Sequence, residues 1–259
     1  MLTSNRRATG IGVDCIIPET SQIEDNVSIG SRVVFAGKDI IVRNGSIIEA
    51  AAVIGEGVTI GRGALVRAGA VVLSSVPPNA IVEGNPAQIV GYREAKQYPD
   101  RGPRGVLDAS AFDGMKTPAS IPLGVGKGKL FLMRRVSDAR GVLTVGEVRK
   151  ELPFIPERYF VVFDVPSSEL RGEHAHKVCQ QFLICVHGSC RVLLDDGVNR
   201  CEVTLDRPDL GVFMPPMIWG TQYKYSPDAV LLVFASHTYE ANDYLRTYDE
   251  FLSELEQLK

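Results

Sequence analysis

The sequence predicts an all-β protein with two domains, a parallel β-helix followed by a small β-barrel. Three observations support this prediction: a six-residue repeat in the first ninety residues, a stretch rich in proline and glycine after it, and a series of short β-type runs in the second half. A chain of 259 residues is long enough for two such domains. We expect the β-helix at residues 1–95, a linker at 96–124 and the barrel at 125–259.

Large apolar residues recur at every sixth position in the first part of the chain. After a one-residue slip at residues 49–53 the series resumes and continues to residue 72. Neither a helix nor an ordinary strand has this period, whereas the coils of a hexapeptide β-helix do. The series, which we expect to point inward, is Ile17, Ile23, Ile29, Phe35, Ile41, Ile47, Ile54, Ile60, Val66 and Val72.

The fifth position of each six-residue unit is often small or β-branched, which completes the pattern of a hexapeptide coil. We expect some of these residues to lie on the outer faces, where small side chains suit the packing of one prism against another. Those expected outside are Val58, Ala64 and Ala70, and the others at this position are Val27, Val33 and Ala51.

The repeat closes with PPNAIVEGNPAQIVGYR, residues 77–93, which resembles the end of left-handed β-helix acyltransferases. The resemblance implies a left-handed coil and a trimer around a three-fold axis. Enzymes of that group generally use a histidine base, yet all four histidines of this chain lie after residue 173. Two readings stay open, a module that only drives oligomerisation and an acetyltransferase. The acid–base groups open to the second are Glu24, Asp25, Glu49 and Glu56.

Residues 94–124 are rich in proline, glycine, alanine, serine and charged residues, and we expect a connector with a short helical turn at 94–97. Eight short runs of β-forming residues follow between positions 129 and 236, separated by turn signals. Such a series is typical of a sandwich or barrel. The apolar spacing within residues 241–258 predicts a terminal helix.

The run RGEHAHK contains two histidines separated by one residue, His174 and His176. In a strand this spacing places both imidazoles on one face. The pattern is similar to the first motif of cupin barrels, in which two histidines and a glutamate bind a metal. Here Gln181 occupies the glutamate position, and Gly220 stands where a further histidine ligand is expected.

Three readings of the histidine pair are open: a structural pair, a metal site, and acid–base catalysis without a metal. A metal site needs at least three protein ligands, and glutamine and glycine do not complete the set. A histidine with an unperturbed pKa of about 6.5 can take and return a proton near neutral pH. We therefore expect acid–base catalysis with no metal and no other cofactor.

Four blocks of the second half closely resemble the WxcM-like cupins: RGEHAHK, QQFLICVHGSCRVLLDDG, PPMIWGTQYKYSPDAVLLVFAS and YLRTYDEFL. The resemblance implies an isomerase that moves the keto group of a nucleotide-linked 4-keto-6-deoxyhexose, here expected to be dTDP-linked, from carbon 4 to carbon 3. Members serve the synthesis of 3-amino-3,6-dideoxy sugars and can be fused to a β-helix acetyltransferase. The alternatives are a bifunctional protein whose β-helix acetylates the amino sugar with acetyl-CoA, and a non-catalytic scaffold.

The resemblance also assigns roles to residues. His174 and His176 are implied as the acid–base pair, with Arg171 lining the site. Arg140 is implied as a contact of the nucleotide diphosphate, although either arginine can also be read as part of a surface ion pair. The remaining candidates for substrate contact are Gln181, Trp219, Tyr223 and Phe160.

Two of these assignments have competing explanations. Phe160 stands where some relatives carry a tyrosine, so the hydroxyl is either missing or supplied from elsewhere, and Tyr159 is its neighbour. Core or rim packing accounts for Trp219, Tyr223 and Tyr225 almost as well as stacking on the substrate does.

Composition limits the partners and the location of the protein. The chain is 45% hydrophobic and 23% charged, as in soluble globular proteins, and its net charge of -3 gives no reason to expect a nucleic-acid partner. No run approaches the roughly 20 apolar residues that span a bilayer. The five cysteines lack the spacing of metal or redox motifs. We expect a cytoplasmic homo-oligomer, a trimer or hexamer, without a membrane partner.

Overall fold

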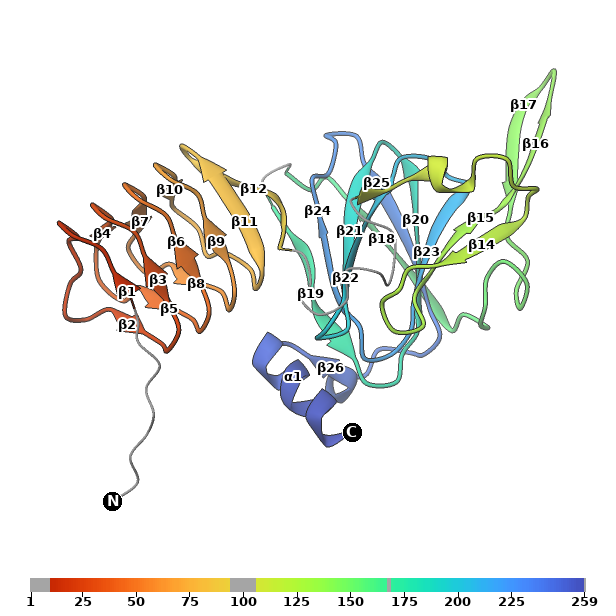
Figure 1. Ribbon diagram of the computed structural model, residues 1–259. Helices are drawn as coiled ribbons and strands as arrows, with labels where there is room; N and C mark the ends of the chain where they lie inside the picture. The colour runs from red at the N-terminus through yellow and green to blue at the C-terminus, as the bar shows by residue number, and fades with distance from the viewer. Residues whose placement is uncertain (1–9, 94–105, 167–168, 259) are drawn as a thin grey trace. The chain divides into compact units, whose positions relative to one another are not determined.

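The computed structural model describes residues 10–93, 106–166 and 169–258, and nearly all of its regular structure is β (Figure 1). The chain divides into two compact units, Met1–Glu94 and Ala95–Lys259. Among the described residues, none of the helices combines the length and the apolar character that crossing a membrane requires. The predicted all-β fold, with a solenoid followed by a barrel, is confirmed.

The first unit is a parallel β-helix in which the chain visits three sheets in turn. The sheets have the orders β1-β3-β6-β9-β11-β12, β10-β7-β4 and β2-β5-β8. Neighbouring strands are parallel except in the closing hairpin of β11 and β12. The strands are β1 (Gly10–Ile11), β2 (Gln22–Ile23), β3 (Ser28–Ile29), β4 (Val34–Ala36), β5 (Ile41–Val42), β6 (Ile47–Ile48), β7 (Val53–Gly55), β8 (Thr59–Ile60), β9 (Leu65–Val66), β10 (Val71–Val72), β11 (Ala80–Gly84) and β12 (Ala87–Tyr92).

The inward residues confirm the six-residue repeat and correct its register in the middle. Ile41 and Ile47, which we expected inside, are only half-buried, and the residue after each takes the interior position. The extra residue of the repeat therefore lies before Val42, not at residues 49–53. The large side chains buried in the coil are Ile29, Phe35, Val42, Ile48, Ile54, Ile60, Val66 and Val72.

A second row of buried side chains lies two positions before the large ones. Our placement of Val58, Ala64 and Ala70 on the outer faces was wrong, because each is at most 3% exposed. Ala52 is buried in the same row, whereas Ala51 is exposed with a φ of 59°. Small side chains fit here because the interior of a narrow coil is already filled by the large residue of each strand.

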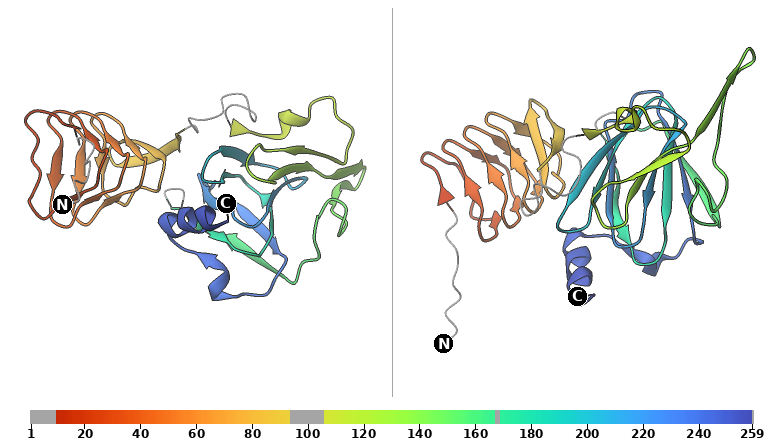
Figure 2. Two further views of the ribbon diagram at one scale, coloured as in Figure 1. Left: turned by 60° about the horizontal axis from the view of Figure 1, so that its bottom comes forward. Right: turned by 45° about the vertical axis from the view of Figure 1, so that its right-hand side comes forward.

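The second unit has two six-stranded sheets that face each other (Figure 2) and a two-stranded hairpin of β16 (Arg134–Asp138) and β17 (Gly141–Val145). The orders of the six-stranded sheets are β13-β22-β21-β24-β19-β26 and β14-β15-β23-β20-β25-β18. The strands are β13 (Val106–Leu107), β14 (Ala119–Pro122), β15 (Lys129–Leu132), β18 (Arg158–Phe163), β19 (Arg171–His176), β20 (Gln181–His187), β21 (Cys190–Asp195), β22 (Arg200–Leu205), β23 (Leu210–Met214), β24 (Trp219–Tyr223), β25 (Val230–Ala235) and β26 (Tyr244–Leu245).

Part of the predicted linker belongs to the barrel. β13 pairs with β22 and β14 pairs with β15, and a short 3₁₀ turn, η1 (Ala109–Phe112), lies between them. Leu107, Phe112 and Leu123 are buried in the main core of the barrel. A linker through residue 124 is therefore too long, because these apolar side chains pack between the sheets. The helical turn predicted at residues 94–97 lies outside the described residues.

The terminal helix is shorter than predicted. Residues 241–245 form a 3₁₀ turn, η2 (Ala241–Asp243), and strand β26, and α1 spans Tyr248–Gln257. The Thr247 hydroxyl accepts a hydrogen bond from the backbone N–H of Glu250, and the Glu250 carboxylate accepts one from the N–H of Thr247. This capping box fixes the start of the helix and leaves the preceding residues free to pair with β19.

The corrected register predicts how two isoleucine substitutions differ. Ile48→Ala should lower the free energy of unfolding by about 2–5 kcal/mol, because it leaves a cavity at a fully buried position. Ile41→Ala is the matched control and should cost clearly less, because its side chain is half-buried. Hydrogen–deuterium exchange of β-helix peptides in the full chain measures both losses. Equal losses, or a larger loss for Ile41→Ala, would contradict the register.

Candidate functional site

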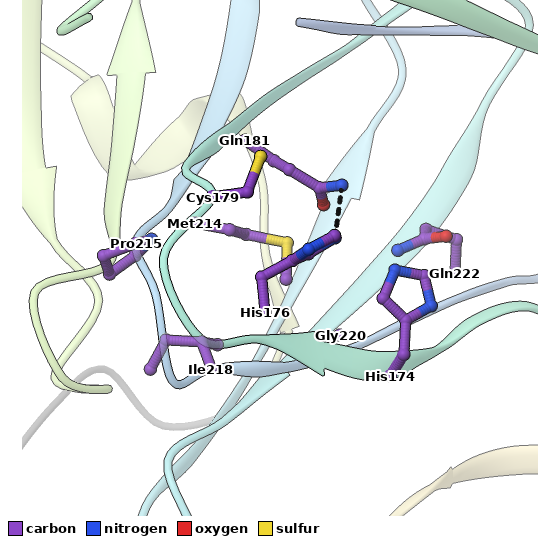
Figure 3. A pocket seen from close by; sticks show the side chains of 9 residues that line it. All are labelled: His174, His176, Cys179, Gln181, Met214, Pro215, Ile218, Gly220 and Gln222. Atoms are coloured by element: carbon purple, nitrogen blue, oxygen red, sulfur yellow. Dashed lines mark hydrogen bonds between the residues drawn. The ribbon is translucent and has the colours of Figure 1, made fainter. Parts of the chain in front are cut away.

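Both histidines of the RGEHAHK run lie on β19 and line one pocket inside the barrel (Figure 3). Their ring centroids are 5.1 Å apart and the ring planes make an angle of 86°. The single residue between them places both rings on the same face, as the spacing predicted. The rest of the pocket is lined by Cys179, Gln181, Met214, Pro215, Ile218, Gly220 and Gln222.

The local geometry of β19 directs His174 into the pocket. Gly172 and Glu173 have positive φ values of 83° and 54°, and the pairing with β24 shifts register at this point. Such an irregularity re-aims the side chain that follows it. Gly220 stands directly opposite His174, and a Cβ at Gly220 would lie only 2.3 Å from Met214 Cε. The glycine therefore leaves room for the Met214 side chain, which also lines the pocket.

His176 is held by a carboxylate that the sequence analysis did not single out. Its Nδ1 lies 2.7 Å from Oδ2 of Asp243, the last residue of η2. The same carboxylate accepts hydrogen bonds from the backbone N–H groups of Val178 at 2.7 Å and Cys179 at 3.3 Å. Because an ionised carboxylate only accepts, the proton of the neutral imidazole is on Nδ1 and the lone pair is on Nε2. The Gln181 side-chain amide lies 3.1 Å from this Nε2.

His174 has the same tautomer for a different reason. Its Nδ1 lies 2.9 Å from the backbone carbonyl oxygen of Gly172, which can only accept a hydrogen bond. Burial lowers the pKa of His174, the Gly172 carbonyl partly offsets this, and the charge of Arg246 lowers it further. Burial lowers the pKa of His176 to about 4, although the hydrogen bond to Asp243 raises it. Both imidazoles are therefore neutral at pH 7 and can accept a proton at Nε2.

Tyr244 on β26 supplies a phenol beside the two imidazoles. It stands directly opposite His176 in the pairing of β19 with β26. Its ring centroid lies 4.3 Å from that of His176 and 5.0 Å from that of His174. Tyr244 is therefore a candidate for the hydroxyl that Phe160 lacks. The apolar spacing of residues 241–258 predicts a helix through Tyr244, which instead lies in β26, so the sequence did not identify it as a site residue.

Two guanidinium groups flank this tyrosine. Arg158 on β18 donates a hydrogen bond to the Tyr244 hydroxyl at 3.3 Å, and the Arg246 guanidinium lies 4.6 Å from the centroid of the same ring. No ion pair joins either arginine to a carboxylate of the described residues. The buried Nε of Arg158 also has no hydrogen-bond partner there. A partly buried cation without a carboxylate partner indicates a site for an anionic group.

Other predicted site residues occupy different surroundings. Phe160 is on β18 near the Arg158 guanidinium, 5.7 Å from its ring centroid. Arg171, at the exposed start of β19, stands opposite Gln222 of the pocket. Arg140 is at the tip of the hairpin of β16 (Arg134–Asp138) and β17 (Gly141–Val145), where it pairs with Asp138 at 2.7 Å. That hairpin projects away from β19 (Figure 1).

The structure does not bring the predicted aromatic residues of β24 to the pocket. Trp219 is 4% exposed and packs on Tyr248 and Phe251 beneath α1. The Tyr223 hydroxyl donates a hydrogen bond to Glu202. The physical reason is the alternation of β24, which directs Gly220 and Gln222 toward the pocket and directs Trp219, Thr221 and Tyr223 to the other face of the sheet. Tyr225, the remaining aromatic candidate, is buried in the main core.

The pocket does not fit the metal set of the cupin motif. Gln181 presents a neutral amide to His176, and Gly220 has no side chain. None of the residues that line the described pocket is a carboxylate. A divalent cation between the two Nε2 atoms would therefore lack the carboxylate ligand that the cupin motif supplies. Catalysis without a metal remains a prediction.

The comparisons with known proteins concern the barrel. A "TDP-4-oxo-6-deoxy-alpha-D-glucose-3,4-oxoisomerase" of Aneurinibacillus thermoaerophilus is 42% identical over 125 residues, which are 48% of this chain and 90% of that protein. A crystal structure of a 3,4-ketoisomerase from Helicobacter canadensis is 39% identical, covering 50% of this chain and 97% of that one, with a TM-score of 0.49. The TDP-quinovose 3,4-ketoisomerase WlaRB from Campylobacter jejuni is 40% identical, covering 50% and 99%, with a TM-score of 0.48.

The family model described as FdtA: WxcM-like, C-terminal matches residues 127–256, which include both histidines, Asp243 and Tyr244. This match spans half of the chain, and the relative from Aneurinibacillus is matched over most of its length. The chain therefore belongs to the WxcM-like (FdtA) family.

Proposed function

We propose that the barrel is a 3,4-ketoisomerase that acts on a dTDP-linked 4-keto-6-deoxyhexose. One observation carries the proposal: two neutral imidazoles whose Nδ1 protons are held by Gly172 and Asp243 line a single pocket, beside a phenol and two guanidinium groups that pair with no carboxylate of the described residues. The Gln181 amide contacts Nε2 of His176 and must give up this position when His176 accepts a proton from the substrate. Isomerisation of a ketone to its neighbouring carbon needs such proton-transfer groups and a cation near the developing negative charge. The names of the relatives supply the class of substrate.

The reaction requires two proton transfers at carbon and one between oxygens. A base removes the proton on carbon 3, the C–H electron pair forms the C3–C4 double bond, and the charge moves to the oxygen on carbon 4. A proton then passes from the oxygen on carbon 3 to that on carbon 4. Return of a proton to carbon 4 gives the 3-keto product, so that no oxidant or reductant is needed. Tyr244 is placed to help the proton transfer between oxygens, and Arg171 stays a candidate for stabilising the enediolate.

We assign the base to His176. Removal of the carbon 3 proton makes its imidazole a cation, and the Asp243 carboxylate at 2.7 Å stabilises that cation. His174 has only the Gly172 carbonyl on Nδ1 and faces the charge of Arg246, so its cation is less stabilised and returns a proton more readily. His174 is therefore the group that we assign to delivering the proton to carbon 4. Because it is neutral in the free protein, it first takes a proton at Nε2 from solvent, and the His176 imidazolium loses its proton to solvent to complete the cycle.

Arg158 and Arg246 are the proposed contacts of the diphosphate. Both lie beside Tyr244, whose ring packs against the two imidazoles, and neither has a carboxylate partner among the described residues. Guanidinium groups bind phosphate oxygens through paired hydrogen bonds. Phe160 and Tyr239 lie within 5.7 Å of the Arg158 guanidinium and offer apolar surface to the nucleoside. The contact predicted for Arg140 is less favoured, because that residue already pairs with Asp138.

We propose that the β-helix drives oligomerisation. Glu24 pairs with Arg43 and Glu49 pairs with Arg67, so two of the four candidate acid–base groups already bridge adjacent coils. Two of its three sheets also carry partly buried apolar side chains on their outer faces, which supports association with further copies. These residues are Ile47, Leu65 and Ile81 on one sheet and Val34, Val53 and Val71 on another.

The free cysteines favour a reducing compartment, so cytoplasm is the proposed location.

The division of roles between the histidines predicts distinct defects. His174→Asn and His176→Asn should each lower turnover by about 10²–10⁴-fold, since each removes one acid–base group. In deuterated water, His174→Asn should still exchange the carbon 3 proton of the substrate, whereas His176→Asn should not. Proton NMR of the sugar ring follows this exchange. Wild-type turnover in both variants would place the site elsewhere. If only His176→Asn still exchanged the carbon 3 proton, His174 would be the base and His176 the group that protonates carbon 4.

Replacement of Asp243 predicts a change in both rate and pH profile. The amide that Asp243→Asn introduces can donate to Nδ1 of His176 and so favours the wrong tautomer, and turnover should fall by about 10²–10⁴-fold. Asp243 raises the pKa of His176, so its loss lowers that pKa further. Because the base acts in its neutral form, the acid limb of kcat/KM should move to lower pH. Glu256→Gln, on the exposed end of α1, is the control and should leave the pH profile unchanged. A shift of the acid limb to higher pH in Asp243→Asn would contradict the assignment.

The proposed diphosphate site predicts a binding defect. Arg158→Gln should raise KM by about tenfold or more and lower kcat less, because it removes a contact to a part of the substrate that does not react. Arg140→Gln is the matched control, and it should change KM by less than about twofold. Steady-state kinetics on both variants decides between the arginines. A larger effect at Arg140 would favour the assignment made from the sequence.

A further inference from the structure

The strongest unassigned cluster lies on the side of His176 that faces away from the proposed reaction. A ring nitrogen of His176, the Cys179 thiol and a carboxylate oxygen of Asp243 all lie within 4.8 Å of one another, and Nδ1 is the ring nitrogen that contacts Asp243. Cys179 also lines the pocket, although the proposed chemistry does not use it. We propose that these three residues bind one Zn²⁺ ion, or a divalent ion of similar softness, and that the bound ion inhibits the isomerase.

The donor set suits zinc in type and charge. Zinc in proteins prefers imidazole nitrogen, thiolate sulfur and carboxylate oxygen, usually in a tetrahedron. A thiolate and a carboxylate together balance the two charges of the ion, and a water molecule completes the four positions. Tetrahedral bond lengths of about 2.0–2.3 Å imply separations of about 3.3–3.5 Å among one nitrogen, one oxygen and one sulfur donor. Because the three donor atoms lie within 4.8 Å of one another, they need shifts of at most about 1.5 Å.

The surrounding residues shield the proposed site and orient the Asp243 carboxylate. His176 is 5% exposed and Cys179 is 2% exposed, so the ion would be largely shielded from bulk water. The backbone N–H of Val178 binds Oδ1 of Asp243 at 2.7 Å, which leaves Oδ2 to face the imidazole. Hydrogen bonds of this kind orient a ligating carboxylate and strengthen metal binding. Cys179 follows His176 by three residues, so both ligands come from the same short segment.

This site differs from the metal set of the cupin motif. The cupin arrangement would use the Nε2 atoms that face the pocket, together with position 181. The proposed site uses the opposite ring nitrogen of His176 and excludes both His174 and Gln181. Zinc binding must displace the proton on Nδ1 and the proton of the thiol, so affinity should rise with pH.

Inhibition follows from the change in the base. An ion on Nδ1 replaces the hydrogen bond to Asp243 and places positive charge next to the imidazole. Nε2 then becomes a much weaker proton acceptor, and the carboxylate no longer stabilises the imidazolium. This step rests on the proposed isomerase function, whereas the binding of the ion does not.

Cobalt binding tests the site without reference to catalysis. The full chain, freed of metal by a chelator and desalted, is titrated with Co²⁺ while its absorption spectrum is recorded. We expect one equivalent to give a thiolate-to-cobalt band in the near ultraviolet, and Zn²⁺ to remove it. Cys179→Ser, Cys179→Ala and Asp243→Asn should each lose the band, and circular dichroism checks that they are folded. Cys15→Ser, in the β-helix, is the matched control and should keep it. No band in the wild type, or a band that survives Cys179→Ser, would overturn the site.

Zinc inhibition is measured in each variant relative to its own rate without metal. Saturating Zn²⁺ should lower wild-type turnover by more than tenfold, and a chelator should restore it, while Cys179→Ser should lose less than twofold. Stoichiometric cobalt binding without inhibition by zinc would overturn the regulatory part of the proposal. A metal-free chain that does not isomerise the keto sugar would contradict the proposed function, and the cobalt spectrum would still decide whether the site exists.

Discussion

The hydrogen bond between His176 Nδ1 and Asp243 Oδ2 is the interaction on which the proposed chemistry depends. It fixes the tautomer of a buried imidazole, and it provides the only carboxylate contact that either histidine has in the described part of the barrel. The contact exists because residues 241–245 do not belong to α1. The capping box at Thr247 makes the helix begin after them, and β26 then pairs with β19. A local rule of helix termini thus sets the geometry of the proposed base.

The electrostatics of the pocket follow from the same arrangement. Burial and the neighbouring guanidinium groups both disfavour a charged imidazole, and for His176 they outweigh the carboxylate, so that its pKa falls to about 4. A base with so low a pKa is neutral throughout the physiological range, but it is also weaker in the ground state. The carboxylate at Nδ1 and an anionic substrate near Arg158 and Arg246 both favour the imidazolium once a proton has moved. In the proposed mechanism, the negative charge of the bound substrate therefore adds to that of Asp243 in stabilising the imidazolium.

Much of the fold and part of the site could be predicted from the sequence. The period of six and the His-x-His spacing are local patterns, and a β-helix or a strand converts each directly into a direction of side chains. The position of the extra residue near Val42 was missed because Ile41 and Val42 are both aliphatic, so the pattern fits either register. Asp243 and Tyr244 were missed because an apolar spacing compatible with a helix continues through them. Their contact with β19 depends on a pairing between residues nearly seventy positions apart.

The aromatic residues of β24 show the opposite case, in which the sequence contained the answer. Once Gly220 is placed opposite an inward histidine, alternation alone directs Trp219 and Tyr223 to the other face of the sheet. The two ring nitrogens of His176 likewise have different neighbours. Gln181 and Gly220 remove the ligands that a metal would need at the pocket face of the ring, and Asp243 and Cys179 provide ligands at the other face. In the proposed mechanism, His176 can therefore act as a base through Nε2 only while its Nδ1 is hydrogen-bonded to the Asp243 carboxylate. Whatever occupies Nδ1 controls the basicity of Nε2, because the two atoms share one π system.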